Sequence, residues 1–323
     1  MKRFFAGAMT FAVLLPAAAP DVSAQQYPNK PIRLVVGFAA GGPSDVSART
    51  IGQKLTEKWV QQVIVDIRPG AGGNIATEIV AKAPADGYTL LEPAFAHAAN
   101  PSLYSKLPFD AIRDFAPILL FASIANLLVV HPSIPVHSVK ELIAFAKARP
   151  NQLTYGSAGN GTASHLAGEL LVLMGGIKLT HVPYKGLAPA HTEIMGGQLS
   201  LMFDGIVTGM PAVKAGRLRA LAVTTSKRWQ GTPDIPTMSE AGLAGFEVNS
   251  WYGLLAPAGT PREIILKLNT EVARSLREPD ARERLYSIGA EPMSNTPEEF
   301  AAYIAAEMAK WAKVVKTAGI RAD

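Results

Sequence analysis

The feature that most constrains the fold is an alternation of short apolar runs with longer helical patterns along most of the 323 residues. Each apolar run has the length of a buried strand, and turn residues such as glycine separate it from the helix that follows. The runs are 32–38, 63–67, 88–92, 153–157, 179–182, 199–203 and 218–224. Strands joined through helices usually run parallel, with right-handed crossovers. The alternation therefore predicts an α/β fold with mostly parallel sheets flanked by helices.

The alternation occurs in two blocks, which indicates two lobes. A single core rarely grows beyond about 250–300 residues, and a second block of strands and helices starts near Ser138. Apolar strand patterns at 118–130 and 248–255 are the places where the chain would cross between the blocks. We expect one lobe from residues 25–127 plus 251–323 and the other from 128–250, with a hinge at the crossings. Amphipathic helices near 263–276 and 298–316 should cover the sheet of the first lobe.

The first 24 residues have the pattern of a secretory signal peptide. Lys2 and Arg3 precede an apolar stretch at 4–19, and Ala24 ends a cleavage pattern of small residues. The stretch is short and its end is interrupted by Pro16, which argues against a permanent membrane anchor. No other apolar run reaches about 18 residues. We expect cleavage near Ala24 and export of the remaining chain.

Composition argues against several classes of function. The chain has no cysteine, so disulfides, thiolate chemistry and cysteine-based zinc sites are excluded. The six histidines are scattered without the spacing of a metal-binding helix. Basic residues are dispersed rather than clustered, although the formal charge is +5. We therefore expect no metal, no cofactor and no nucleic-acid partner, and the small positive excess is compatible with anionic ligands.

Two glycine-containing turns are the strongest candidates for a binding site. The first is 41–45, after the strand that ends near Phe38, and the second is 157–164. A helix N-terminus leaves free amide groups and a partial positive charge, and glycine lets an anion approach that backbone closely. Either turn alone is an ordinary connection in an α/β protein. One such turn in each lobe would place two anion-binding sites on the same cleft. Neither turn matches a phosphate loop or a dinucleotide fingerprint.

The candidate ligand-binding residues come from these turns and from the ends of neighbouring strands. They are Phe38, Gly41, Gly42, Ser44, Asp45, His97, Ser157, Gly159, Asn160, Gly161, Thr162 and Asp204. Asp45 and Asp204 could instead cap their neighbouring helices. A carboxylate repels an anionic ligand, so a ligand contact of either residue would require an amine, a hydroxyl or a bridging water. Phe38 is either a core-edge residue or a wall of the cleft. His165 is interpreted as structural support for the second turn.

Many short blocks along the chain resemble the Bug family, the extracytoplasmic receptors of tripartite tricarboxylate transporters. They include YPxKPIR at 27–33, GGPSD at 41–45, RPGAGGN at 68–74, ADGYTL at 85–90, YGSAGNGT at 155–162, VPYKG at 182–186 and MFD at 202–204. The resemblance implies a two-lobed periplasmic-binding-protein fold, a type II-like Venus flytrap. It also implies a small organic carboxylate held by the two turns, partly through water, and integral membrane transporter subunits as partners.

Two departures from the family pattern concern the ligand. The family often has prolines where Ala39 and Ala40 stand, and glycine plus threonine where Pro43 and Ser44 stand. At residues 92–97, where the family is expected to have a stretch of small and polar residues, this chain has a segment that contains Phe95. This ring either narrows the pocket or favours an aromatic ligand. The identity of the carboxylate is therefore left open.

We expect a receptor that closes its two lobes around the ligand and delivers it to a transporter, rather than an enzyme. An alternative is a sensor that presents the ligand to a receptor kinase, and the sequence does not separate the two. A third hypothesis is an exported serine hydrolase that uses Ser157 or Ser164. Ser157 lacks the Gly-x-Ser-x-Gly context, and the sequence identifies no oriented base and third partner to act with His165.

Overall fold

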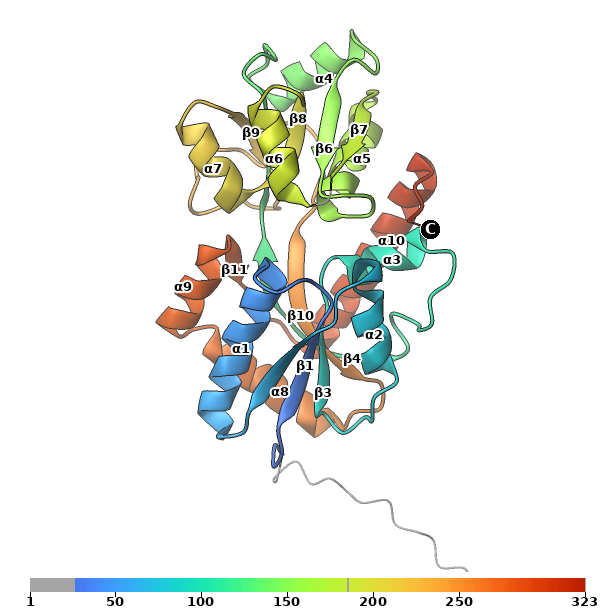
Figure 1. Cartoon of the computed structure of the whole chain (residues 1–323), viewed down its shortest axis with the longest axis vertical. Coiled ribbons are helices and arrows are strands. Elements are labelled where there is room, and N and C mark those ends of the chain that lie inside the picture. The colour runs from blue at the N-terminus through green and yellow to red at the C-terminus, as the bar shows by residue number, and fades with distance from the viewer. Residues whose placement is uncertain (1–26, 185, 323) are drawn as a thin grey trace, which may run out of the picture.

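The computed structural model describes residues 27–184 and 186–322, so the expected signal peptide lies outside the described residues. The described chain forms two α/β lobes, each built on its own β-sheet (Figure 1). In Figure 1 the lobes stand one above the other, and the chain passes between them in two places. The C-terminal segment returns to the lobe in which the described chain begins.

The first lobe contains a six-stranded sheet with the order β11-β4-β10-β3-β1-β2. Its strands are β1 (Ile32–Val36), β2 (Val63–Ile67), β3 (Thr89–Glu92), β4 (Phe115–Ile124), β10 (Ser250–Pro257) and β11 (Ala290–Pro292). Its helices are α1 (Pro43–Trp59), α2 (Asn74–Ala81), α3 (Ala96–Leu103), α8 (Arg262–Ser275), α9 (Pro279–Ser287) and α10 (Pro297–Ala318), with a 3-10 turn at Ala71–Gly73.

The second lobe contains a five-stranded sheet with the order β7-β6-β8-β5-β9. Its strands are β5 (Asn126–Val130), β6 (Thr154–Ser157), β7 (Thr180–Pro183), β8 (Leu201–Gly205) and β9 (Arg219–Val223). Its helices are α4 (Val139–Lys147), α5 (Ala163–Gly175), α6 (Leu187–Met195) and α7 (Ile206–Lys214). Strands and helices alternate through this lobe, as the apolar runs predict.

The two-lobed α/β fold is confirmed, but its sheets are mixed rather than mostly parallel. β1 pairs in parallel with β2 and β3, and β6 pairs in parallel with β7 and β8. β10 runs antiparallel to β3 and β4, β11 to β4, and β5 to β8 and β9. The antiparallel pairs involve the crossing strands and their neighbours, because a chain that arrives from the other lobe enters the sheet from the opposite end.

The apolar pattern at 118–130 corresponds to two strands in different sheets. β4 ends at Ile124 and β5 begins at Asn126, so Ala125 alone separates them. The Asn126 amide donates to Thr224 Oγ1 (3.1 Å), and Asn126 Nδ2 donates to the Val248 carbonyl (3.3 Å). These bonds fasten the first crossing to the segment that leads into the second. At the first crossing, the strand pairing changes from one sheet to the other at Ala125. The lobe limits at 127/128 and 250/251 stay a prediction.

Helices α8 and α10 cover the first sheet, as their spacing predicts. Ile264, Leu268 and Val272 of α8 are buried in the core of the first lobe. Helix α10 begins with a capping box in which the side chains of Thr296 and Glu299 each accept a hydrogen bond from the other's amide. Such a cap satisfies amides that would otherwise lack acceptors at the start of this 22-residue helix.

Helix α10 packs against α3 of its own lobe and against α5 of the second lobe. Beyond the helix, the Ala322 amide donates to the Leu103 carbonyl of α3 (3.0 Å). Asn100 and Pro101 belong to α3, so this helix contains a proline in its interior. The proline forfeits only one hydrogen bond there, and Asn100 Nδ2 ties the helix to the Gly72 carbonyl (3.0 Å). Within the described residues, no helix is long and apolar enough to span a membrane.

Candidate functional site

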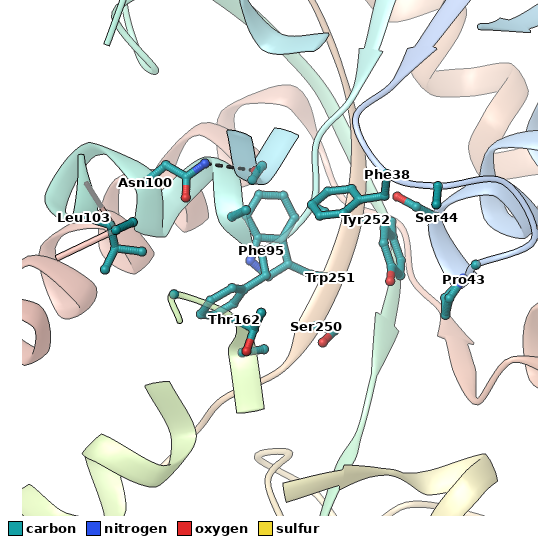
Figure 2. Close-up of a pocket in the computed structure, with 18 of the residues that line it drawn as sticks. Phe38, Pro43, Ser44, Phe95, Asn100, Leu103, Thr162, Ser250, Trp251 and Tyr252 are labelled. Carbon is teal, nitrogen blue, oxygen red and sulfur yellow. Dashed lines mark hydrogen bonds between the residues drawn. The ribbon is translucent and has the colours of Figure 1, made fainter. Parts of the chain in front are cut away.

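A cavity of about 570 Å³ lies between the two lobes. The first turn contributes residues 38–44 and the second contributes 160–163, so both predicted turns reach it (Figure 2). The rest of the wall consists of Gly72, Ala94, Phe95, Ala96, Asn100, Leu103, Tyr104, Ser250, Trp251, Tyr252 and Ala322. This cavity is the candidate binding site, because its size and its mixture of apolar and polar walls are typical of small-molecule pockets.

The first turn is supported from behind by Asp45. Asp45 Oδ2 accepts a hydrogen bond from the Gly41 amide (2.9 Å), and Asp45 Oδ1 lies 2.7 Å from Arg49 Nε. Gly41 has a φ of 80°, a left-handed conformation that favours glycine. Helix α1 begins directly afterwards at Pro43, and the amides of its first turn have no acceptor within the helix. Asp45 therefore shapes the turn without lining the cavity.

Glu92 is buried beneath the first turn, at the end of β3. Its carboxyl oxygens lie 2.5 Å from Ser44 Oγ and 2.6 Å from Ser47 Oγ. Burial raises the pKa of Glu92 well above its usual range, despite the two serine hydrogen bonds that act in the opposite direction. The protonated acid adds no negative charge beside the cavity. It can also donate its proton to Ser44 Oγ, which frees the Ser44 hydroxyl hydrogen for a ligand.

The amides of the second turn are largely satisfied within the turn itself. Four of them donate locally: Ala158 to Ser164 Oγ, Gly159 to Ser157 Oγ, Gly161 to His165 Nδ1 and Thr162 to the Gly159 carbonyl. Thr162 is also the N-cap of α5, where its Oγ1 accepts from the His165 amide. The second turn is therefore a rigid wall, and the start of α5 at Ala163 supplies its remaining amide donors.

Stacked rings hold the second turn in place. The His165 and His181 rings are stacked with their centroids 4.0 Å apart, and Tyr155 stacks on His181 at 4.7 Å. Burial, together with the neighbouring His181, lowers the pKa of His165 to about 3. Burial lowers the pKa of His181 to about 4. A neutral His165 can accept the hydrogen bond from Gly161, so the low pKa preserves the shape of the turn.

Ser157 pairs with His181 rather than with His165. Ser157 Oγ lies 2.6 Å from His181 Nε2, and the serine is completely buried. A nucleophile must reach its substrate, and Ser157 is not among the residues that line the cavity. The geometry therefore offers no support for a serine hydrolase at this position.

Aromatic side chains form a large part of the cavity wall. Phe38 comes from the first turn and Phe95 from the start of α3, where its ring packs edge-on against Trp311 at 4.9 Å. Trp251 and Tyr252 belong to β10, and our sequence analysis did not identify them. Their position on β10 is the signal that could have revealed them, because the chain passes between the lobes at the start of this strand (Figure 1).

The structure brings seven of the predicted residues to the cavity and leaves five outside its lining. The lining residues are Phe38, Gly41, Gly42, Ser44, Asn160, Gly161 and Thr162. The residues outside are Asp45, His97, Ser157, Gly159 and Asp204. A direct ligand contact of these five stays a prediction, and the structure accounts for each of them through local bonds.

Asp204 and His97 are engaged inside their own lobes. Asp204 is fully buried; its Oδ2 lies 2.5 Å from His191 Nδ1, and its Oδ1 accepts from Thr208 Oγ1 (2.8 Å) at the start of α7. His97 Nε2 donates to the Ala111 carbonyl (2.9 Å), and burial lowers the pKa of His97 to about 4. A position at the end of a strand therefore did not predict that the side chain faces the cavity.

The cavity offers neutral groups to a ligand. Among the described residues that line it, none is acidic or basic. The described residues also contain no group of three side chains suited to hold a metal ion. An anion in this cavity would be stabilised by amides, hydroxyl groups and the N-termini of α1 and α5 rather than by a cationic side chain.

A comparison of sequences connects the chain to one protein family. The family described as "Tripartite tricarboxylate transporter family receptor" matches residues 47–320. Protein BugT of Bordetella pertussis is 35% identical to this chain, over 99% of each of the two proteins. The similarity therefore extends over both lobes.

Solved structures agree with this similarity. Rpa4515 of R. palustris, solved with adipate, is 42% identical over 91% of this chain and 99% of its own, with a TM-score of 0.78. MatC of Rhodopseudomonas palustris, solved with bound malate, is 35% identical over 90% of this chain and 100% of its own, with a TM-score of 0.74. Both of these similar proteins were solved with small carboxylates.

Proposed function

Because the chain belongs to the receptor family of tripartite tricarboxylate transporters, we propose that it captures a small organic carboxylate between its lobes and delivers it to integral membrane transporter subunits. The family consists of solute-binding receptors, so the chain is not an enzyme. Periplasmic localisation, after removal of the signal peptide near Ala24, is part of the same proposal. The observation that carries it is the cavity lined by one helix-opening turn from each lobe.

The binding mode follows from the two helix N-termini. A carboxylate at the first turn would accept hydrogen bonds from the opening amides of α1 and from the Ser44 hydroxyl. Closure would then bring the second turn, with Thr162 and the start of α5, against the other side of the ligand. A ligand that contacts both turns favours the closed arrangement by its differential affinity. The transporter subunits would recognise that arrangement.

Calorimetry with a panel of carboxylates tests the proposal. We expect at least one panel member to bind, and Ser44→Ala to weaken it by about tenfold, the usual effect of losing a hydrogen bond to a charged group. Thr162→Val should also weaken binding, because it removes the hydrogen bond from Thr162 Oγ1 to the Gly159 carbonyl (2.7 Å) and the cap that shapes the second turn. Thr192→Val is the matched control, because Thr192 is exposed on α6 and does not line the cavity. Failure of the folded protein to bind any carboxylate would refute the receptor assignment.

Delivery to a transporter requires a test in cells. Deletion of the gene should abolish uptake of the radiolabelled ligand, and the wild-type chain should restore uptake while Ser44→Ala restores it poorly. Normal uptake together with a lost transcriptional response to the ligand would favour a sensor instead.

A further inference from the structure

Aromatic rings line the cavity between the two turns. In the view of Figure 2, the rings of Phe38, Phe95, Trp251 and Tyr252 occupy the space between Ser44 and Thr162. Phe95, Trp251 and Tyr252 are 5%, 0% and 7% exposed. Packing therefore fixes these rings before a ligand arrives. Rigid rings favour a flat aromatic partner, because rings attract each other in stacked or edge-to-face geometries.

The polar side chains of the cavity lining belong to both turns and to α3 and β10, and several of them are already in use. Ser44 is hydrogen-bonded to Glu92, and Asn100 Nδ2 already donates to Gly72 and Asn74. The described lining contains no lysine, arginine or histidine. A carboxylate can be held at a turn, whereas the rest of the ligand meets mainly apolar surface. This distribution favours a ligand whose body is apolar.

The nearest acidic groups also argue against an amino acid as the ligand. An ionised carboxylate is the strongest partner for an ammonium group, yet Asp45 is paired with Arg49 behind the first turn. Glu92 is enclosed by Ser44 and Ser47 and has both of its oxygens occupied. Burial of an ammonium without such a partner is strongly unfavourable.

We infer that the ligand is an aromatic carboxylate, with its carboxylate at the first turn and its ring against Phe38 and Phe95. The inference rests on the proposed receptor function, because it names the ligand class of the same cavity. Binding of a rigid ring costs less conformational entropy than binding of a flexible alkyl chain, because the chain loses rotational freedom. Phe38 and Phe95 are then the residues that determine specificity.

Calorimetry with two matched sets of acids tests this inference. The aromatic set is benzoate, phenylacetate and benzene-1,4-dicarboxylate; the aliphatic set is hexanoate, malate and adipate. We expect the best aromatic acid to bind at least about tenfold more tightly than the best aliphatic acid. Hexanoate separates the contribution of the ring from that of an apolar body alone.

Variants at the two phenylalanines provide the second measurement. Phe38→Leu and Phe95→Leu keep an apolar side chain but remove the ring, so each should weaken the aromatic acid by about fivefold to tenfold and leave hexanoate within about twofold. Phe38 is only partly buried, which makes its variant the less disruptive one. Phe145→Leu on α4 is the control, because this partly buried ring lies outside the cavity.

The outcomes separate the inference from the function on which it rests. Tighter binding of an aliphatic acid, or equal losses for both sets in the leucine variants, would overturn the aromatic ligand class and leave the receptor assignment intact. Absence of binding by all six acids to the folded protein would overturn both.

Discussion

Glu92 is a buried acid directly beneath Ser44 of the first turn, and the proton on Glu92 decides what Ser44 can donate. With the acid protonated, the hydroxyl of Ser44 is free to face a carboxylate. With the acid ionised, Ser44 and Ser47 must both donate to it, and a second negative charge lies beside the ligand. The charge beside the cavity therefore depends on Glu92, although Glu92 does not line the cavity itself.

Glu92→Gln should remove a pH dependence of stability. Burial raises the folded-state pKa of Glu92, so the folded protein binds more protons than the unfolded chain above about pH 4.5, and this contribution is lost as pH rises through the folded pKa. As pH rises above about 4.5, wild type should lose stability relative to the variant, with a limiting slope of roughly 1.4 kcal/mol per pH unit until the folded-state pKa is reached. Urea unfolding at several pH values measures the difference. Parallel curves would mean that Glu92 is ionised in the folded protein.

Local signals predicted the turns, whereas side-chain direction was not predictable from the sequence. Gly41 indicates a left-handed turn, and Thr162 indicates a helix N-cap. Each of these signals depends only on a few neighbouring residues. Asp204 and His97 also follow strands, yet their partners His191 and Ala111 come from other parts of the chain. Only the folded structure shows that these side chains are used inside the lobes.

At the scale of elements, the crossing between β4 and β5 is a connection of one residue. A single residue, Ala125, joins two strands of different sheets, and no turn residue marks the change. The sequence therefore predicted one continuous strand, because both halves are buried and equally apolar. The direction of the crossing strands was also unpredictable, since it depends on the side from which the chain enters each sheet.

Asn126→Ala should loosen the link between the two crossings. The variant loses the side-chain bond from Asn126 Nδ2 to the Val248 carbonyl, which is worth about 1 kcal/mol. Hydrogen–deuterium exchange should accelerate at the amides of Thr224 and Val248, which lie in the connected segment. Asn269→Ala is the control, because its side chain bonds to Ile118 and Asn295 within the first lobe. Equal exchange at Val248 in both variants would show that Asn126 does not restrain the crossing.

At the scale of the whole molecule, buried histidines make stability depend on pH in the opposite sense to Glu92. Burial lowers the pKa of His97 and of His181 to about 4, and burial together with His181 lowers that of His165 to about 3. The unfolded chain, with histidine pKa near 6.5, therefore binds more protons than the folded protein between these values. Stability from this source is complete above about pH 6.5 and decreases as pH falls toward 4.

His97→Gln should flatten the acid limb of the stability profile. Gln retains a donor for the Ala111 carbonyl but cannot take up a proton. From about pH 6.5 down to 4, wild type should lose roughly 1 kcal/mol per pH unit more than the variant does. Urea unfolding at pH steps measures this, and His137→Gln, which changes an exposed histidine, should follow wild type. A His97→Gln profile that also follows wild type would contradict the role of burial.

The hydrogen bond from Ala322 to Leu103 has a practical consequence for engineering, because both residues belong to the cavity wall. A group attached at Ala322 would therefore lie beside the cavity. A bulky purification handle there would obstruct entry, whereas a small environment-sensitive dye would report occupancy directly. Ala322 is thus a suitable position at which to attach the dye of a biosensor.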